Sequence, residues 1–265
     1  MKLKSHSISY FFSILWSVVL YRLANSELKS QFILKGGILF YVWTKKKFRP
    51  TKDLDFSFYG DFNPDKIFLA IQKVLSVPIP EDALSFEGFK MKPIKEDHEY
   101  EGIRITFKGK IDRTWIPMQL DISTGDKITP GTSLIEFPQL LDMDAPTINT
   151  YPKETVFAEK VEAMVKLDIG TSRMKDVYDL YIIITMFGKQ LDKTILLKAI
   201  QTTFSHRKTP VPEVPVKIFS NHFFDNADKQ KEWQAFITES TEPDLGLEDA
   251  INTIADFLNP LLLMK

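Results

Sequence analysis

The sequence predicts an α+β protein, in which a unit of strands and helices precedes a helical domain. Three segments in the first half alternate apolar and polar residues, as half-buried strands do; they are DLDFSF (53–58), YEGIRITFKG (100–109) and WIPMQLDIS (115–123). In the second half the apolar residues recur every three or four positions instead, which is the period of a helix. ETVFAEKVEAMVKL (154–167) and SRMKDVYDLYIIITMF (172–187) show this pattern.

The remaining elements follow from similar local patterns. QFILKGGILFYVW (31–43) predicts a short apolar strand, a Gly-Gly turn and then a helix. Helical periodicity also extends over PDKIFLAIQKVLSV (64–77). Three further helices are expected towards the C-terminus, at DKTILLKAIQTTF (192–204), KEWQAFI (231–237) and LEDAINTIADFL (247–258).

A linker is expected where the pattern changes. LDMDAPTINTYPKET (141–155) contains two prolines and no clear period. We therefore expect an α/β core over residues 1–145 and a helical C-terminal domain over residues 146–265.

The N-terminal segment has two interpretations. A basic start followed by an apolar stretch over 8–21 resembles the outline of an export signal. However, its apolar residues fall at helical spacing, and roughly 14 apolar positions are too few for a bilayer, which needs about 20. The pattern favours a buried helix over an export signal, and no stable membrane association is expected.

The composition is that of an ordinary globular protein, with 265 residues, 44% apolar and 26% charged. The chain has 34 basic and 35 acidic residues, so its net charge is −1 and binding of nucleic acid would require a local basic patch. The chain has no cysteine, which excludes disulfides, thiolate catalysis and cysteine–zinc sites and fits a reducing cytoplasm. The four histidines are scattered, which argues against a zinc enzyme or a histidine-based triad.

Two carboxylates share one face of the strand at 53–58. Residues two apart in a strand point the same way, so Asp53 and Asp55 lie together while Leu54 and Phe56 pack inward. Such a D-x-D pair suits Mg²⁺, which takes oxygen ligands and usually retains phosphate oxygens in its shell. The simpler alternative is a solvated strand face.

A third carboxylate, Asp121, lies between Leu120 and Ile122 in another apolar strand. An aspartate there costs burial energy unless it is paired, binds a metal or faces solvent. Three aspartates on two strands would suit a two-metal site for phosphoryl transfer. An outward-facing Asp121 on a half-buried strand remains the alternative.

Phosphate-binding features precede the D-x-D strand. Gly36 and Gly37, between a strand and a helix, allow the backbone to approach a ligand closely, although turn chemistry alone also explains them. A basic run ends at Lys52 and includes Arg49, which could neutralise a triphosphate or an RNA backbone; the alternative is a solvated loop.

The helical half contributes a lysine and two aspartates. Lys160 flanks the apolar stripe of its helix, so we expect its stem to be half buried. Asp176 begins the stripe of the next helix, and Asp179 lies one turn later. These residues could line a cleft, or Lys175 and Asp179 could form an ordinary i,i+4 pair.

Four motifs, in order over residues 31–187, resemble those of the AbiEii/AbiGii toxin family. LKGGILF followed by RPTKDLDF resembles the opening motif of that family, and QLDIS resembles the motif with its third carboxylate. YPKETVFAEKVEAMVKL is similar to the Y-x-x-E-x-x-x-A-E-K motif, and RMKDVYDLYII to the R-x-K-D-x-x-D-L motif.

The resemblance implies a nucleotidyltransferase fold, a mixed sheet flanked by helices with a C-terminal helical domain. It implies a cytoplasmic toxin of a type IV toxin–antitoxin or abortive-infection system, with a cognate antitoxin as partner. Such an enzyme transfers a nucleoside monophosphate from an NTP to an acceptor, the tRNA 3′ end or another RNA, with Mg²⁺ or Mn²⁺.

The resemblance also implies the roles of individual residues. Asp53 and Asp55 would be metal ligands, with Asp121 as a third, and Asp121 or Asp176 would take the proton of the acceptor. The catalytic set implied is Asp53, Asp55, Asp121, Lys160 and Asp176. The nucleotide-binding set implied is Gly36, Gly37, Arg49, Thr51, Lys160, Arg173 and Asp179.

One position departs from the family pattern. The hydroxyl residue that usually follows the glycine pair is Ile38 here, which removes one phosphate contact. Two alternatives to the toxin hypothesis stay open, and Ile38 supports the first of them. One is a catalytically silent protein that binds RNA or protein, and the other is a small-molecule nucleotidyltransferase of the antibiotic-modifying kind.

Overall fold

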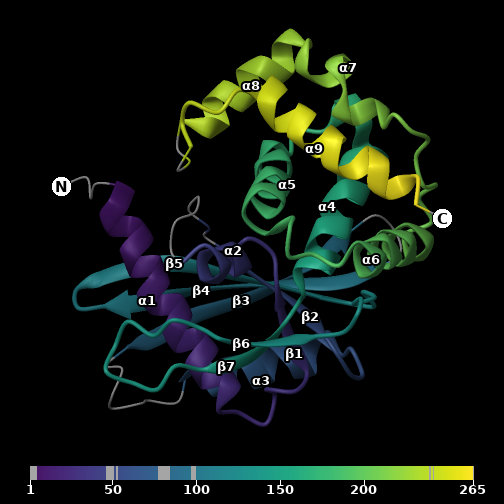
Figure 1. The fold of residues 1–265 in the computed structure, drawn as a ribbon. Coiled ribbons are helices and arrows are strands. Elements are labelled where there is room, and N and C mark those ends of the chain that lie inside the picture. The colour runs from purple at the N-terminus through teal and green to yellow at the C-terminus, as the bar shows by residue number, and fades with distance from the viewer. Residues whose placement is uncertain are drawn as a thin grey trace. The chain divides into compact units, whose positions relative to one another are not determined.

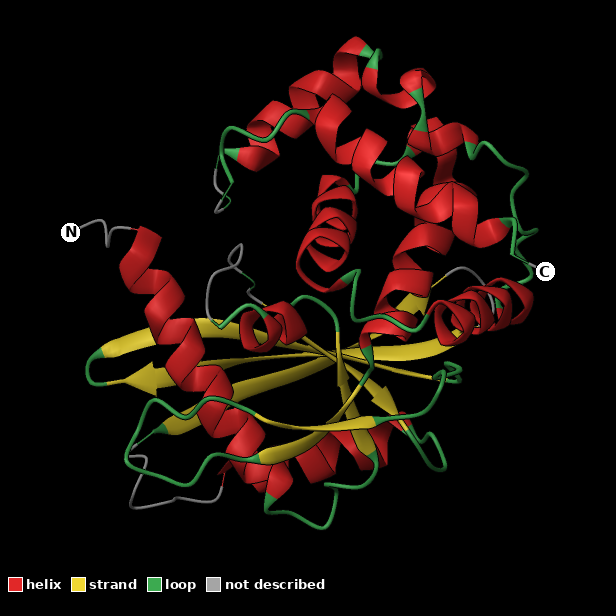
Figure 2. Cartoon of the chain, in the orientation of Figure 1, coloured by secondary structure: helices red, strands yellow, loops and turns green. Residues whose placement is uncertain are grey.

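The chain forms two compact units in the computed structural model. The structure describes residues 5–45, 51, 53–76, 84–96, 100–238, 240 and 242–264. Unit 1 contains Met1–Asp126 and Thr132–Tyr151, and unit 2 contains Lys127–Gly131 and Pro152–Lys265. The described strands all belong to unit 1, whereas unit 2 is helical (Figures 1 and 2).

Unit 1 is built on a mixed sheet, and the expected α+β class is confirmed. Within the described residues its strand order is β3-β4-β5-β2-β1-β7-β6. The pairs β2–β5 and β1–β7 are parallel, and the other neighbours are antiparallel. The strands are β1 Phe32–Lys35, β2 Asp53–Phe58, β3 Ser85–Glu96, β4 Tyr100–Ile111, β5 Thr114–Thr124, β6 Ser133–Glu136 and β7 Thr147–Thr150.

The strands expected from alternation at 53–58, 100–109 and 115–123 are confirmed as β2, β4 and β5. Three strands were not expected from the sequence. In β3 the Gly88 bulge and Pro93 interrupt the alternation, and β6 and β7 are only four residues long. β7 lies inside the segment expected to be a linker.

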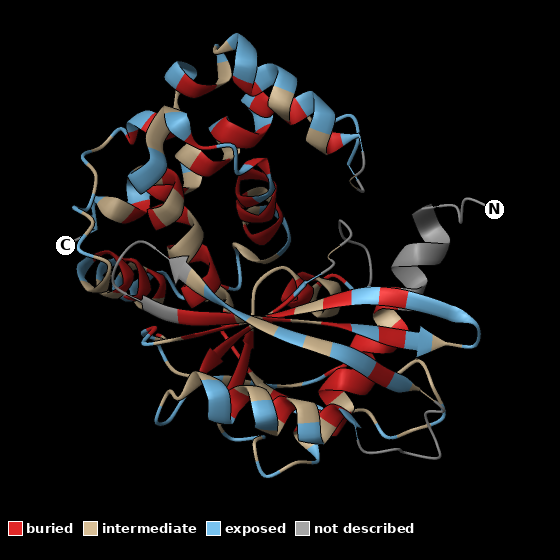
Figure 3. Cartoon of the chain, turned by 180° about the vertical axis from the view of Figure 1, so that it is seen from behind, coloured by how far each residue is buried: buried red, intermediate tan, exposed pale blue. Residues whose placement is uncertain are grey.

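The two faces of the sheet differ in chemistry. The register places Leu54, Leu120 and Ile105 on one face, where all three are fully buried. The residues between them, including Asp55 and Asp121, lie on the other face. Figure 3 shows this alternation as bands of buried and more exposed residues along the long strands.

Helices α1 (Ser5–Ala24) and α3 (Pro64–Ser76) belong to unit 1 and supply apolar side chains to its core. The predicted N-terminal helix is confirmed as α1, whose Leu15, Val18 and Val19 are completely buried. Leu15 lies directly over Gly109 of β4. Within the described ranges, no helix combines the length and the apolar character that a membrane span requires.

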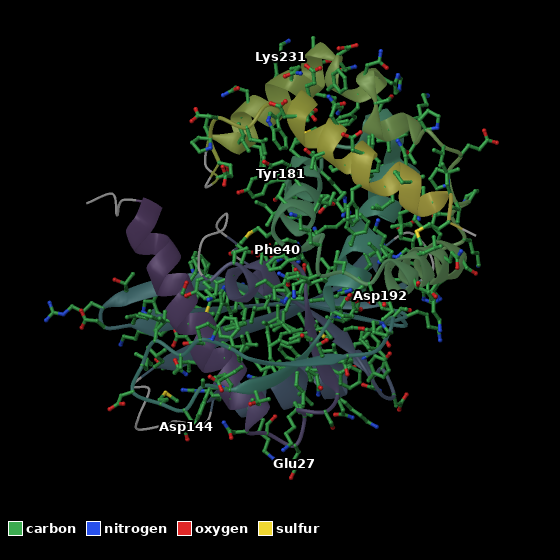
Figure 4. All side chains as sticks on the ribbon, viewed as in Figure 1. Glu27, Phe40, Asp144, Tyr181, Asp192 and Lys231 are labelled. Atoms are coloured by element: carbon green, nitrogen blue, oxygen red, sulfur yellow. The ribbon has the colours of Figure 1, made fainter. Side chains whose placement is uncertain are left out.

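Unit 2 has its own apolar core, in which α4 packs on α6 and α5 packs on α9. The predicted helices are confirmed, with bounds α4 Lys153–Leu167, α5 Met174–Phe187, α6 Lys193–His206, α8 Ala227–Ile237 and α9 Leu247–Leu262. The structure adds α7 at Asn221–Phe224 and two 3₁₀ turns, at Asp168–Gly170 and Lys217–Phe219. Asp192, labelled in Figure 4, caps α6 by accepting bonds from the backbone N–H of Thr194 and Ile195.

We expect Gly109→Ala to destabilise unit 1. The added Cβ would lie 2.6 Å from Leu15 Cδ2 and 2.8 Å from Met118 Sδ, and overpacking of this kind costs about 1–3 kcal/mol. Urea unfolding followed by circular dichroism measures the loss. Gly170→Ala is the control, because a Cβ at that position meets nothing within 4 Å. Equal stability of the two variants would contradict the packing of α1 on β4.

Candidate active site

The predicted D-x-D residues lie on the polar face of β2. Leu54 and Phe56 are buried and fix the strand in the core, so Asp53 and Asp55 point away from it. Asp53 is exposed, and Asp55 is half-buried. In the sheet register Asp55 is the neighbour of Lys35 on one side and of Asp121 on the other. The fold thus brings the predicted carboxylates Asp55 and Asp121 onto adjacent strands.

The glycine turn after β1 makes room for Asp55. Gly36 has a φ of +76°, and a Cβ built on it would lie 2.0 Å from Asp55 Oδ2. Gly36 is therefore needed both for the left-handed backbone and for the close approach of the carboxylate. The sequence predicted these two residues as parts of one site, and the structure places them in direct proximity.

The helix after the glycine turn is short. Gly37 is the N-cap of α2 (Ile38–Trp43), and no side-chain hydrogen bond caps this end. Ile38, which replaces the usual hydroxyl residue, is a buried core residue together with Leu39 and Phe40. Phe40 is labelled on α2 in Figure 4.

Arg104 on β4 binds Asp121. Its Nε donates to Asp121 Oδ1 at 2.8 Å and its Nη2 to Oδ2 at 2.6 Å, which is a bidentate ion pair. Gln119 Nε2 also donates to Asp121, at 3.2 Å. Asp121 thus lies on the expected face beside Asp55, with both carboxylate oxygens bound by protein groups.

Electrostatics connects Arg104 to the whole carboxylate cluster, by which we mean Asp53, Asp55 and Asp121. The pKa of Arg104 is raised, chiefly by its hydrogen bond to Asp121. Partial burial opposes this effect, and the negative charges of the three carboxylates raise the pKa further. Arg104 is the fixed positive charge at this cluster that the sequence analysis did not identify.

Lys35 forms a second ion pair at the end of β1. Its Nζ donates to Ser123 Oγ and to Asp126 Oδ2, each at 2.7 Å. Tyr151 donates its hydroxyl hydrogen to the same Asp126 oxygen at 2.8 Å. This network fixes the last residue before the glycine turn and therefore supports the position of Gly36.

One buried polar atom on this face lacks a partner. Ser57 is two residues after Asp55, on the same side of β2, and is completely buried. Within the described residues its Oγ has no hydrogen-bond partner. Burying an unsatisfied hydroxyl is costly, and a functional role is one explanation for such an atom in a native structure.

Of the two residues before β2 that were predicted to contact the triphosphate, the structure describes Thr51 but not Arg49. Thr51, just before β2, is half-buried. Arg49 lies outside the described residues, as do Lys46, Lys47 and Lys52 of the same basic run.

Unit 2 holds the other predicted charges as one cluster, which we call the lysine cluster. Lys160 of α4 contacts Asp176 and Asp179 of α5, with Nζ 2.7 Å from an oxygen of each. All three side chains are largely buried, and that of Asp179 is 0% exposed. Arg173 lies 3.6 Å from Asp176 at a more exposed position. Asp179 pairs with Lys160 of the neighbouring helix, whereas Lys175 is exposed.

The carboxylate cluster has the donor chemistry for a hard cation. Mg²⁺ binds oxygen ligands, and one or two protein carboxylates suffice when substrate phosphates complete its shell. Asp53 and Asp55 fit that requirement, and the absence of a side chain at Gly36 lets the Asp55 carboxylate lie against the glycine turn. In the described part of the chain, no three His, Cys, Asp or Glu side chains are already grouped to hold a metal ion.

Comparison with known proteins identifies a family and solved structures of similar fold. A sequence model described as nucleotidyltransferase AbiEii toxin, type IV toxin–antitoxin system, matches residues 18–256. JHP933 from Helicobacter pylori and an H. pylori protein described as a candidate nucleotidyltransferase each align with a TM-score of 0.57 and 12% identity. These alignments cover 98% of this chain and 94% and 96% of those chains. No curated protein matches this chain.

We expect Gly36→Ala to weaken divalent-cation binding by displacing the Asp55 carboxylate. Gly88→Ala is the matched control, since Gly88 also has a positive φ, +69°, but a Cβ there meets nothing within 4 Å. Both variants should lose about 1–2 kcal/mol of stability from backbone strain. Calorimetric titration with Mn²⁺ and a non-hydrolysable NTP should show weaker binding for Gly36→Ala alone. If both variants bound the cation equally well, Gly36 would have no role in the cation site.

We expect Lys160→Met to destabilise unit 2 strongly. Removing the cation leaves Asp176 and Asp179 buried without it, and breaking a buried pair in this way costs about 3–5 kcal/mol. Adding Asp176→Asn and Asp179→Asn should restore most of that stability, because the buried negative charge is then gone. Thermal unfolding of the three proteins tests this, and a fully stable Lys160→Met single variant would contradict the buried triad.

Proposed function

The chain belongs to the AbiEii nucleotidyltransferase toxins of type IV toxin–antitoxin systems, and from this premise we propose that it transfers a nucleoside monophosphate from an NTP to an RNA acceptor. The family resemblance inferred from four sequence motifs is thereby confirmed. The observation that supports the proposed reaction is the position of Asp55, beside Gly36 of the glycine turn and next to Asp121 in the sheet.

In this proposal Asp53 and Asp55 hold Mg²⁺ or Mn²⁺ together with oxygens of the NTP. The cation would offset negative charge on the triphosphate and on the leaving pyrophosphate. The backbone at Gly36 and Gly37 would bind a phosphate, with Arg49 and Thr51 contributing from the segment before β2.

The reaction is an in-line displacement. The acceptor hydroxyl oxygen forms a bond to the α-phosphorus, the bond from that phosphorus to the bridging oxygen breaks, and pyrophosphate leaves. The hydroxyl proton passes to a carboxylate, for which Asp121 and Asp176 are the two candidates. The two hydrogen bonds from Arg104 fix the orientation of the Asp121 carboxylate.

The lysine cluster is proposed to bind nucleotide phosphates. Its family motif supports this role for Lys160, with Arg173 and Asp179 as further nucleotide-binding residues. In the structure two carboxylates hold the Lys160 ammonium group in one orientation. A fixed cation of this kind loses little side-chain entropy when it meets a phosphate.

The Lys160→Met variants described above distinguish phosphate binding by the lysine cluster from its contribution to the stability of unit 2. The triple variant with Met at position 160 should be stable but inactive. If that variant transferred nucleotide, Lys160 would not be a nucleotide-binding residue.

The family implies a cognate antitoxin, and we propose that the toxin acts in the cytoplasm on RNA, with a tRNA 3′ end as the first acceptor to test. Ile38 supports one alternative, a silent binding protein, because a buried apolar side chain supplies no hydroxyl to a phosphate. The other alternative is an antibiotic-modifying nucleotidyltransferase. A screen of RNA and small-molecule acceptors would distinguish such an enzyme from one that acts on RNA.

We expect Asp55→Asn to abolish nucleotidyl transfer while the fold is retained. Loss of one carboxylate charge from the cation site should lower the rate at least about 100-fold, in line with the loss of a major electrostatic contribution. Purified protein with Mg²⁺, each labelled NTP in turn and total RNA provides the assay. Asp144→Asn, at the exposed position labelled in Figure 4, is the control and should be fully active.

Growth arrest on expression in cells gives an independent measure for the same pair of variants. Full toxicity of Asp55→Asn would overturn the proposed function.

A further inference from the structure

A basic surface continues the polar face of the sheet beyond the carboxylate cluster. Lys92 is the register partner of Arg104, which is itself the partner of Asp121. Lys90 on β3 and Lys108 on β4 extend the same face, because they lie at the positions that alternate with buried residues. We define the basic face as Lys90, Lys92, Lys108, Lys110 and Trp115.

The basic face is exposed and positively charged. Each of its four lysines is exposed, and Glu87, the register partner of Lys108, is an acidic residue on the same side. Arg104 and Asp121 balance one another at its border. The whole chain has a net charge of −1, so four lysines on one side of two strands are a strong local departure from the average.

The spacing of these charges suits an extended polyanion. Residues two apart in a strand are about 7 Å apart, and neighbouring strands about 4.8 Å, so the lysines form a regular array. Trp115 on β5 is 39% exposed, and Lys110 Nζ lies 5.4 Å from the centre of its ring. A positively charged surface with an exposed aromatic ring is how proteins bind single strands without reading their sequence.

We propose that the basic face binds the single-stranded end of the acceptor RNA and leads it towards Asp53 and Asp55. This inference rests on the proposed function for its choice of RNA as the ligand. Three strand-to-strand steps separate β3 from β2, about 15 Å, which a few nucleotides span. Lysines on an edge strand also prevent aggregation, so the test must separate RNA binding from that protective role.

The test compares two quadruple variants of the full chain. The first replaces the four lysines of the basic face by glutamine. The control replaces four exposed helical lysines, Lys66, Lys73, Lys193 and Lys198. Both carry the same change in charge, and neither alters a buried residue. Fluorescence anisotropy with a short unstructured oligoribonucleotide, without NTP or divalent cation, measures affinity at several salt concentrations.

We expect the basic-face variant to lose at least tenfold in affinity, with the control close to the unsubstituted protein. The slope of log K against log salt should fall by about 2–3, because each phosphate contact with a single strand contributes about 0.7. Trp115→Ala should weaken binding about tenfold through lost stacking. Equal affinity of the two quadruple variants, or preference for duplex RNA over the single strand, would overturn the inference.

The same proteins show whether the inference or the proposed function has failed. Asp55→Asn should bind RNA normally while it transfers nothing. If no variant, the unsubstituted protein included, transfers nucleotide but binding depends on the basic face, the inference stands and the proposed function falls. If transfer occurs and the KM for RNA is unchanged in the basic-face variant, the inference falls alone.

Discussion

The parallel register between β2 and β5 is the constraint on which the rest of unit 1 depends. It aligns Asp55 with Asp121 while it aligns Leu54 with Leu120 and Phe56 with Ile122 in the core. A slip of one residue would exchange the two faces, so burial of the apolar side chains fixes where the carboxylates point. The energy that holds the acidic groups together therefore comes from apolar packing on the reverse side of the sheet, which offsets their mutual repulsion.

The sequence was sufficient where a local pattern determines the outcome. Strict alternation defined β2, β4 and β5, and helical periodicity defined α4 and α5 with the charges at their margins. It was insufficient for β3, where the Gly88 bulge shifts the register. It was also insufficient for β7, whose four residues are stabilised by pairing with β6 and β1 rather than by their own pattern. Short strands depend on their neighbours, and neighbours are not visible in a linear sequence.

Contacts between distant segments also explain which charged residues of the candidate site could be predicted from the sequence. Asp53, Asp55 and Lys160 belong to local motifs, whereas the partner of Asp121 comes from another strand. Arg104 is 17 residues away in the chain, and only the antiparallel β4–β5 register shows that the two meet. Lys35 belongs to the glycine-turn motif, yet its partner Asp126 lies 91 residues further along the chain. Ion pairs of long sequence separation follow from topology and not from composition.

The Arg104–Asp121 pair has a consequence for how this toxin is made. Acidic groups held close together repel one another. Where a bound ion compensates this repulsion, folding depends on the supply of that ion. Here the guanidinium supplies part of the compensation from within the chain. Folding of unit 1 and the proposed binding of a divalent cation are then separate events, so a cell depleted of such ions would still accumulate folded protein.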